Sequence, residues 1–202
     1  MKARLLDARA PLALLAFAAA GVAMWSLRYA FPHVPAPSPL TNFVVRRTTL
    51  CVHAVSASVA LLTGPWQFWS TARRGALHRW LGRLYAAMVL VGGITAVILA
   101  LPAQTGAVAS GGFFVLGILW LVTTALAVQT ILQRDVPAHR RWMIRSYGLT
   151  TAAITLRIYL PLAIALKLPM PVAYPAIAWL CWVPNALVAE LLVTRTRARP
   201  TP

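Results

Sequence analysis

Histidine is the residue of this sequence best suited to chemistry, and two of the four histidines belong to copies of one short motif. The segment HRWLGRLY occupies residues 78–85, and HRRWMIRSY occupies residues 139–147. Both copies contain Trp-x-x-Arg-x-Tyr, with His78 two residues and His139 three residues before the tryptophan. Each copy stands where a long apolar run begins. Because a neutral imidazole binds transition metals and haem iron, this pair is the first candidate for a functional site.

The two histidines are predicted to lie at one depth on two parallel helices, which suits a b-type haem. Such a haem needs two facing axial imidazoles, small residues that admit the flat ring, and side chains that hold its propionates. Gly82 lies one helical turn beyond His78. The implied enzyme class, if the protein is an enzyme, is a haem-dependent membrane oxidoreductase that exchanges electrons with a quinone or a partner chain. The candidate cofactor-binding residues are His78, His139, Arg83, Arg145, Tyr85 and Tyr147, with His78 and His139 as the metal ligands.

Three other interpretations of the motif stay open. Tryptophan and tyrosine gather at membrane interfaces and arginine on the cytoplasmic side, so the motif can be an interfacial belt without a ligand. A zinc or copper site is less favoured, because such sites need further Cys, His or carboxylate ligands nearby. The third interpretation is a non-redox protein, either a structural, lipid-anchored bundle or a path for protons or small solutes. The sequence has no Ser-His-Asp set, P-loop or dinucleotide fingerprint.

Further polar residues interrupt the apolar runs and form a candidate polar seam. They are His53, Gln67, Arg157, Asn185 and Glu190. An ionisable group within a bilayer costs about 2.5 kcal/mol or more, so each needs a partner or a purpose. Glu190 is expected to pair with Arg83 or Arg145, with a proton relay as the alternative. His53 is expected to bond a neighbouring carbonyl, with a lone metal ligand or a proton carrier as alternatives. For Arg157, snorkelling, a backbone carbonyl and an anionic ligand stay open.

The elements that position these residues are predicted to be membrane-spanning helices. The chain is 60% hydrophobic and 11% charged, with a mean hydropathy of +0.73, which lies outside the range of soluble domains. Crossing a hydrocarbon core of ~30 Å takes roughly 20 apolar residues per helix. The predicted fold class is therefore an all-α, polytopic membrane helix bundle with six transmembrane helices. The spans are placed near residues 11–30, 48–69, 79–101, 112–132, 142–166 and 172–194.

The spans suggest a simple domain organisation. Residues 1–42 are predicted to form an N-terminal anchor helix and a Pro-rich outer loop, residues 43–196 a five-helix core, and residues 197–202 a short basic tail. The first helix is interpreted as a retained anchor, because its apolar run exceeds the ~7–15 residues of a signal-peptide core; cleavage is the alternative. Small and polar residues recur along one face of the second and third spans, so these faces are expected to contact protein. Gly64-Pro65 is expected to kink the second span.

The net charge of +16 comes from 19 basic and 3 acidic residues, and its distribution predicts the orientation. When the spans are threaded in order, most basic residues fall on one side of the membrane, whereas the loop at residues 102–111 on the other side has no charge. Both termini are therefore predicted to be cytoplasmic, in the cell (inner) membrane. The basic patches are expected to attract anionic lipid headgroups by about 1 kcal/mol per residue. This clustering at a membrane surface argues against a nucleic-acid partner.

Four ordered motifs resemble the bacterial membrane family catalogued as domain of unknown function 2306. They are GPWQF at residues 64–68, the two histidine-containing segments, and WVPN at residues 182–185 with Glu190, and they cover roughly residues 46–194. The family has no assigned activity, so the resemblance implies none.

A looser similarity is to the six-helix cytochromes b, which carry haem ligands on four successive helices in two pairs. Here the third and fifth spans match with His78 and His139, but the fourth offers only Gln129 near its inner end. His53 is left unpaired. The similarity therefore implies at most one haem.

Overall fold

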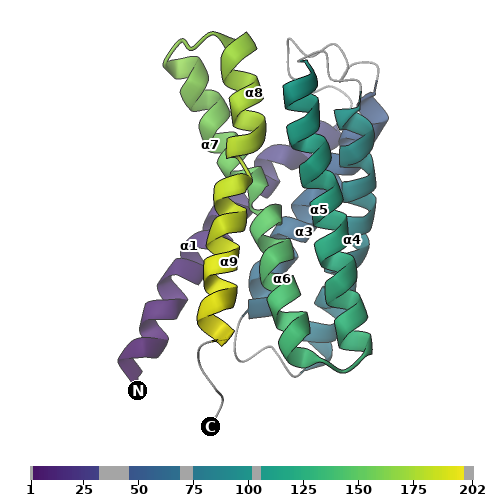
Figure 1. Cartoon of the computed structure of the whole chain (residues 1–202), viewed down its shortest axis with the longest axis vertical. Helices are drawn as coiled ribbons and strands as arrows, with labels where there is room; N and C mark the ends of the chain where they lie inside the picture. Colours follow the sequence, from purple (N-terminus) through teal and green to yellow (C-terminus); the bar gives the residue numbers. More distant parts are fainter. Residues whose placement is uncertain (1, 32–45, 69–74, 102–105, 198–202) are drawn as a thin grey trace.

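The computed structural model describes residues 2–31, 46–68, 75–101 and 106–197, and all regular structure within them is helical (Figure 1). Six helical stretches are long and apolar enough to cross a membrane. They cover residues 10–27, 47–68, 76–100, 107–132, 136–165 and 170–195. The prediction of an all-α membrane bundle with six spans is confirmed. Most of the expected Pro-rich loop, from residue 32, and the basic tail from residue 198 lie outside the described residues.

Each of the first four spans is essentially one helix, whereas the last two are each divided near the middle of the span. The undivided helices are α1 (Lys2–Leu27, followed by the short 3-10 helix η1, Arg28–Ala30), α3 (Arg47–Phe68), α4 (Ala76–Ala100) and α5 (Ala107–Leu132). The divided spans consist of α6 (Val136–Thr150) with α7 (Ala152–Ala165), and of α8 (Met170–Leu180) with α9 (Val183–Arg197). Pro184 gives a physical reason for the second division, because proline cannot donate a helix hydrogen bond.

The helices that carry His78 and His139 begin earlier than the sequence predicts. The predicted starts are residues 79 and 142, whereas α4 begins at Ala76 and α6 at Val136. The early start of α6 follows from an N-terminal cap, since the Asp135 carboxylate accepts a hydrogen bond from the backbone N–H of Ala138 at 2.9 Å. Both histidines therefore belong to the first turn of a helix, where the backbone positions their side chains.

Four helices form a ring, and the others cover its outside. In the ring α3 packs on α4, α4 on α5, and α5 on α6, while a narrower contact joins α6 to α3. The helices α4 and α6 therefore face each other diagonally across the ring. Outside it, α1 packs against α3, α8 against α5, and α9 against α6. Both termini lie at the same end of the bundle, together with the turn between α5 and α6 (Figure 1). The side of the membrane on which this end lies stays a prediction.

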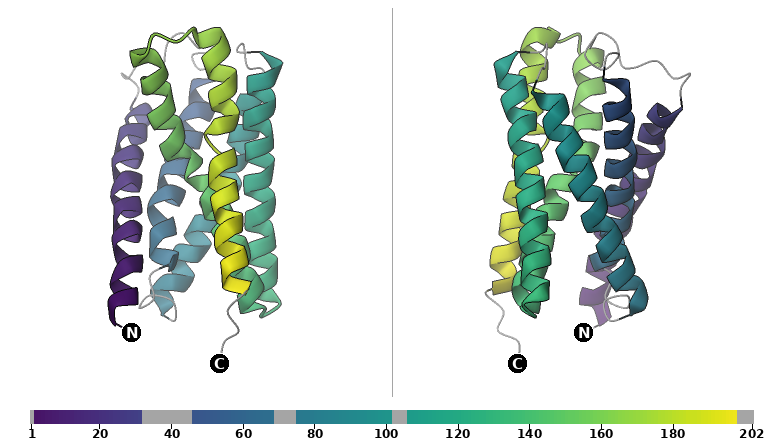
Figure 2. Two further views of the ribbon diagram at one scale, coloured as in Figure 1. Left: turned by 60° about the vertical axis from the view of Figure 1, so that its left-hand side comes forward. Right: turned by 90° about the vertical axis from the view of Figure 1, so that its right-hand side faces the viewer.

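Glycines bring α4 and α5 close together in one half of the bundle only. A Cβ on Gly93 would lie 2.6 Å from the Leu121 side chain, and one on Gly117 would lie 2.9 Å from the Val97 side chain. Small residues allow such close approach between membrane helices. Away from these contacts, toward the end that carries the termini, α4 diverges from α5 (Figure 2).

The Gly64-Pro65 pair of α3 receives the ring of Tyr147 from α6. Proline at position 65 has no N–H to donate to the Leu61 carbonyl four residues earlier, which leaves that acceptor unused within the helix. The Tyr147 hydroxyl donates to this carbonyl at 3.1 Å. A Cβ on Gly64 would overlap the tyrosine ring, so only glycine leaves room for it. The motif GPWQF thus forms the contact that joins α3 to α6.

We predict that Gly64→Ala disrupts this contact and lowers the free energy of unfolding by about 1–3 kcal/mol, as overpacking of a well-packed core does. The matched control is Gly21→Ala in α1, because a Cβ there meets nothing within 4 Å. The control should leave stability unchanged or raise it by up to about 1 kcal/mol through helix propensity. Thermal unfolding in detergent, followed by circular dichroism, measures both. Equal stability of the two variants would contradict the role given to Gly64.

Candidate functional site

The centre of the helix ring is a cluster of hydroxyl groups around Tyr85. The Tyr85 side chain is 1% exposed, and its hydroxyl lies 2.7 Å from both the Ser146 and the Thr150 hydroxyls of α6. From α5, the Thr124 hydroxyl lies 2.7 Å from that of Ser146, and the Trp120 N–H donates to Thr150 at 2.8 Å. We call these five residues the hydroxyl cluster. It joins α4, α5 and α6 in the membrane interior, where hydrogen bonds between helices replace water.

The hydroxyl cluster sets the relative depth of the two motif histidines. His78 precedes Tyr85 by seven residues on α4, and His139 precedes Ser146 by seven residues on α6. Seven residues make two helical turns, or about 10 Å, so each histidine lies on the same helix face as its cluster residue. Tyr85 and Ser146 are hydrogen-bonded to each other across the ring. Each histidine lies two helical turns from one of these residues, toward the end that carries the termini, so the two histidines are placed at a similar depth.

A backbone hydrogen bond determines which nitrogen of His139 is available. Its Nδ1 lies 2.8 Å from the Ala127 carbonyl of α5. Since a carbonyl oxygen only accepts, Nδ1 carries the hydrogen, and Nε2 keeps its lone pair. Metal-binding histidines commonly donate their second ring N–H to a carbonyl in this way, which orients the ring.

Gln67 of α3 adds a buried donor beside this region. Its side chain is 8% exposed, and its Nε2 has no hydrogen-bond partner among the residues that the structure describes. Its Oε1 lies against Gly82, where a Cβ would come within 3.4 Å. Gly82 is one helical turn beyond His78. A buried donor without an acceptor is costly, by about 1–3 kcal/mol, and such groups are rare in folded proteins.

The expected ion pair of Glu190 is confirmed, and its partner is Arg145. The Arg145 guanidinium donates from Nε to Oε1 at 2.5 Å and from Nη2 to Oε2 at 2.9 Å. It also lies over the Trp142 ring, 4.6 Å from the centroid. The pair joins α6 to α9 by the two-pronged geometry that makes arginine–carboxylate bonds strong. Arg145 was expected to hold a cofactor propionate, but its guanidinium is engaged with Glu190.

Both motif tyrosines differ from the expectation that they flank a cofactor. The Tyr85 hydroxyl belongs to the hydroxyl cluster, and the Tyr147 hydroxyl donates to Leu61. Their rings pack against each other with centroids 6.5 Å apart, and Tyr147 also packs on Phe68 at 5.6 Å. Neither hydroxyl is presented to a ligand. Arg83, two residues before Tyr85, points away from the ring interior and is exposed.

The outer members of the polar seam are bonded one by one instead of forming a continuous path. The prediction that His53 bonds a neighbouring carbonyl is confirmed, since its Nδ1 lies 2.9 Å from the Gly92 oxygen. Arg157 donates to the Ala153 carbonyl of its own helix at 3.1 Å, the second of its three expected alternatives. The Asn185 amide donates to the hydroxyls of Thr151 and Thr155 and to the Cys181 carbonyl, each at 3.2 Å. No group of three His, Cys, Asp or Glu side chains gathers within the described residues.

The residues that sequence reasoning missed are the partners of Tyr85. Ser146 and Thr150 stand four residues apart on the His139 face of α6, and Thr124 lies on α5. Serine and threonine at helical spacing in an apolar span commonly bond across helices, which is the signal that identifies them. A tyrosine hydroxyl that is buried in lipid without a hydrogen bond is costly, so such partners are expected near Tyr85.

Comparison with known proteins gives one match. Residues 50–193 match the family described as predicted membrane protein (DUF2306). No curated protein and no solved structure matches the chain. The looser likeness to six-helix cytochromes b therefore depends on the sequence pattern alone.

We predict that Arg145 and Glu190 stabilise the fold as a pair. In a double-mutant cycle with Arg145→Gln and Glu190→Gln, the coupling energy should be about 1–3 kcal/mol, because each single variant leaves a polar or charged group without its partner. The control cycle combines Glu190→Gln with Arg83→Gln, the other arginine considered for the pair, and should show coupling near zero. Unfolding in detergent measures both cycles. Equal coupling in the two cycles would show that Glu190 responds to net charge and not to this contact.

Proposed function

We propose that this chain, which belongs to the DUF2306 family of predicted membrane proteins, is a b-type haem protein of the cell (inner) membrane that passes electrons to or from a quinone or a partner chain. The observation that carries the proposal is the placement of His78 and His139. They occupy diagonal helices of the ring, each two turns from one end of the Tyr85–Ser146 hydrogen bond.

The chain's own residues favour ligation by imidazole. The bond from His139 to Ala127 orients the ring so that Nε2 keeps a lone pair that could bind a metal. On the other helix, Gly82 leaves the face one turn beyond His78 without a side chain. Gln67, next to this glycine, brings a buried donor that a propionate or another acceptor of the bound group would satisfy.

The hydroxyl cluster supports the same placement by closing the ring interior on one side of the histidines. Its side chains occupy the space between α4, α5 and α6 at the level of Tyr85, so the proposed planar group would lie toward the end that carries the termini. There α4 diverges from α5 (Figure 2). This position lies near one membrane surface, where a quinone headgroup or a partner chain is within reach.

Ligation by two histidines implies electron transfer in preference to substrate chemistry. A haem held by His78 and His139 would supply a one-electron couple and not a binding position for a substrate. Within the described residues the third histidine, His53, stands alone toward the other end of the bundle, with its Nδ1 bonded to Gly92. The proposal is therefore one haem, and passage of electrons through the whole membrane needs a second carrier.

We predict that the purified protein, expressed with ample haem, shows the sharp reduced α-band of a b-type haem after addition of dithionite. His78→Ala and His139→Ala should each abolish or broaden this band, because each removes one axial ligand. Visible absorption spectra of the oxidised and reduced protein measure it.

The matched control is His53→Ala, which removes an imidazole from another helix and should keep the band. Circular dichroism and gel filtration establish that all variants are folded. A folded, colourless wild-type protein would overturn the proposal and favour the non-redox alternative. A band that survives in both the His78 and the His139 variant would overturn the assignment of the ligands.

A further inference from the structure

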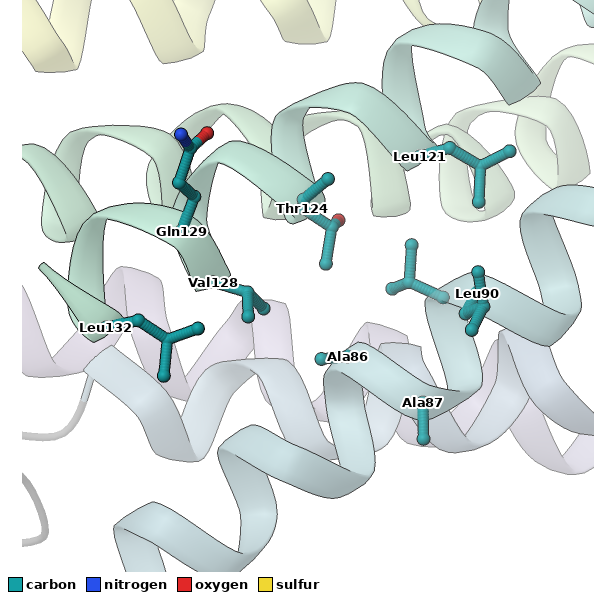
Figure 3. A pocket seen from close by; sticks show the side chains of 10 residues that line it. Ala86, Ala87, Leu90, Leu121, Thr124, Val128, Gln129 and Leu132 are labelled. Carbon is teal, nitrogen blue, oxygen red and sulfur yellow. The ribbon is translucent and has the colours of Figure 1, made fainter.

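An apolar groove lies between α4 and α5 and borders the hydroxyl cluster at Thr124. Its volume is about 470 Å³, and it opens between the two helices (Figure 3). Thr124 and Gln129 are its only polar lining residues, and the Thr124 hydroxyl is already bonded to Ser146. The other lining residues are Ala86, Ala87, Val89, Leu90, Leu121, Ala125, Val128 and Leu132.

The groove follows from the uneven packing of the two helices. Contacts at Gly93 and Gly117 hold α4 and α5 together in one half of the bundle, and toward the turn between α5 and α6 the two helices separate (Figure 2). In the separated half, α4 lines the groove partly with Ala86 and Ala87, whose methyl groups are too short to fill the space. A hydrocarbon chain fits such a surface, because its lining is apolar apart from Thr124 and Gln129.

Two arginines continue the α4 wall of the groove toward the membrane surface. Arg83 precedes Ala87 by four residues and Leu90 by seven, so it lies on the same helix face, and Arg79 precedes Arg83 by four. Both side chains are exposed. Exposed Trp80, at 68%, marks the interface between them.

No carboxylate among the described side chains forms an ion pair with either arginine. The chain has only 3 acidic residues. Of these, Glu190 pairs with Arg145 and Asp135 caps α6. Arg79 and Arg83 are therefore positive charges at the end of an apolar groove, which is the arrangement that binds the headgroup of an anionic lipid.

We propose that the groove binds an anionic phospholipid, with one acyl chain between α4 and α5 and its phosphate at Arg79 and Arg83. Arg83 lies about 10 Å along α4 from Ala76, within reach of the headgroup layer through its long side chain. The acyl chain supplies affinity through buried apolar surface, and the two guanidinium groups supply the preference for negative charge. Neither His78 nor His139 lines the groove, and the test of this proposal does not depend on a bound haem.

The test is competition between phosphatidylglycerol and phosphatidylcholine for the full chain in neutral detergent, with retained lipids counted by native mass spectrometry. The wild-type protein should retain one phosphatidylglycerol in preference to phosphatidylcholine. Each of Arg79→Gln and Arg83→Gln should reduce that preference about fivefold, the ratio that corresponds to the usual attraction per basic residue. Ala87→Phe, which fills the groove, should reduce retention of both lipids.

The control for charge is the double variant Arg140→Gln/Arg141→Gln on α6, at the same end of the bundle. It should leave the lipid preference unchanged. The control for bulk is Ala165→Phe at the exposed end of α7, which should leave retention unchanged. An equal loss of preference in the α4 and α6 arginine variants would overturn the site, because attraction would then depend on overall charge. A wild-type protein with no preference would also overturn it.

Discussion

The bond between the Tyr147 hydroxyl and the Leu61 carbonyl is the contact on which the rest of the structure depends. Pro65 leaves this carbonyl without its helical partner, and a bare carbonyl within a lipid bilayer costs several kcal/mol. The tyrosine of α6 satisfies it, and Gly64 admits the ring. Because α3 and α6 otherwise touch over a small area, this bond closes the four-helix ring and sets the depth of α6. Ser146, the preceding residue, is thereby placed opposite Tyr85.

The divided sixth span also has a side chain bonded to a carbonyl near a proline. Pro184 interrupts the helix, and the nearby Cys181 carbonyl accepts hydrogen bonds from the side chains of Thr155 and Asn185. Thr155 belongs to α7, so the division between α8 and α9 is held by the other divided span. In both places a backbone carbonyl close to a proline accepts a hydrogen bond from a side chain of another helix. These bonds join helices more specifically than apolar packing does, since lipid tails compete for apolar contacts but not for hydrogen bonds.

The sequence predicts what depends on composition and charge, and it fails where a partner on another helix decides the outcome. Six spans, the carbonyl bond of His53 and an arginine partner for Glu190 follow from the cost of polar groups in lipid. The cap at Asp135 starts α6 six residues before the predicted start, because the prediction is based on where the apolar run begins and not on capping residues. The prediction that Tyr85 and Tyr147 flank a cofactor missed the buried hydrogen bonds of both hydroxyls, because a tyrosine near the end of a span can be either interfacial or buried and its residue type does not distinguish the two. Only Ser146 and Thr150, on another helix, identify Tyr85 as buried.

The two copies of Trp-x-x-Arg-x-Tyr show how neighbours give one motif two outcomes. In each copy the tyrosine enters the ring, and the arginine two residues earlier lies about 200° around the helix, away from it. On α6 that outward face is covered by α9, whose Glu190 pairs with Arg145. On α4 no described helix with a carboxylate covers it, and Arg83 stays exposed beside an apolar groove. Interfacial preference explains the tryptophans and arginines of the motif, and core packing explains its tyrosines. The histidines follow the inward face of their helices, where the Ala127 carbonyl orients His139.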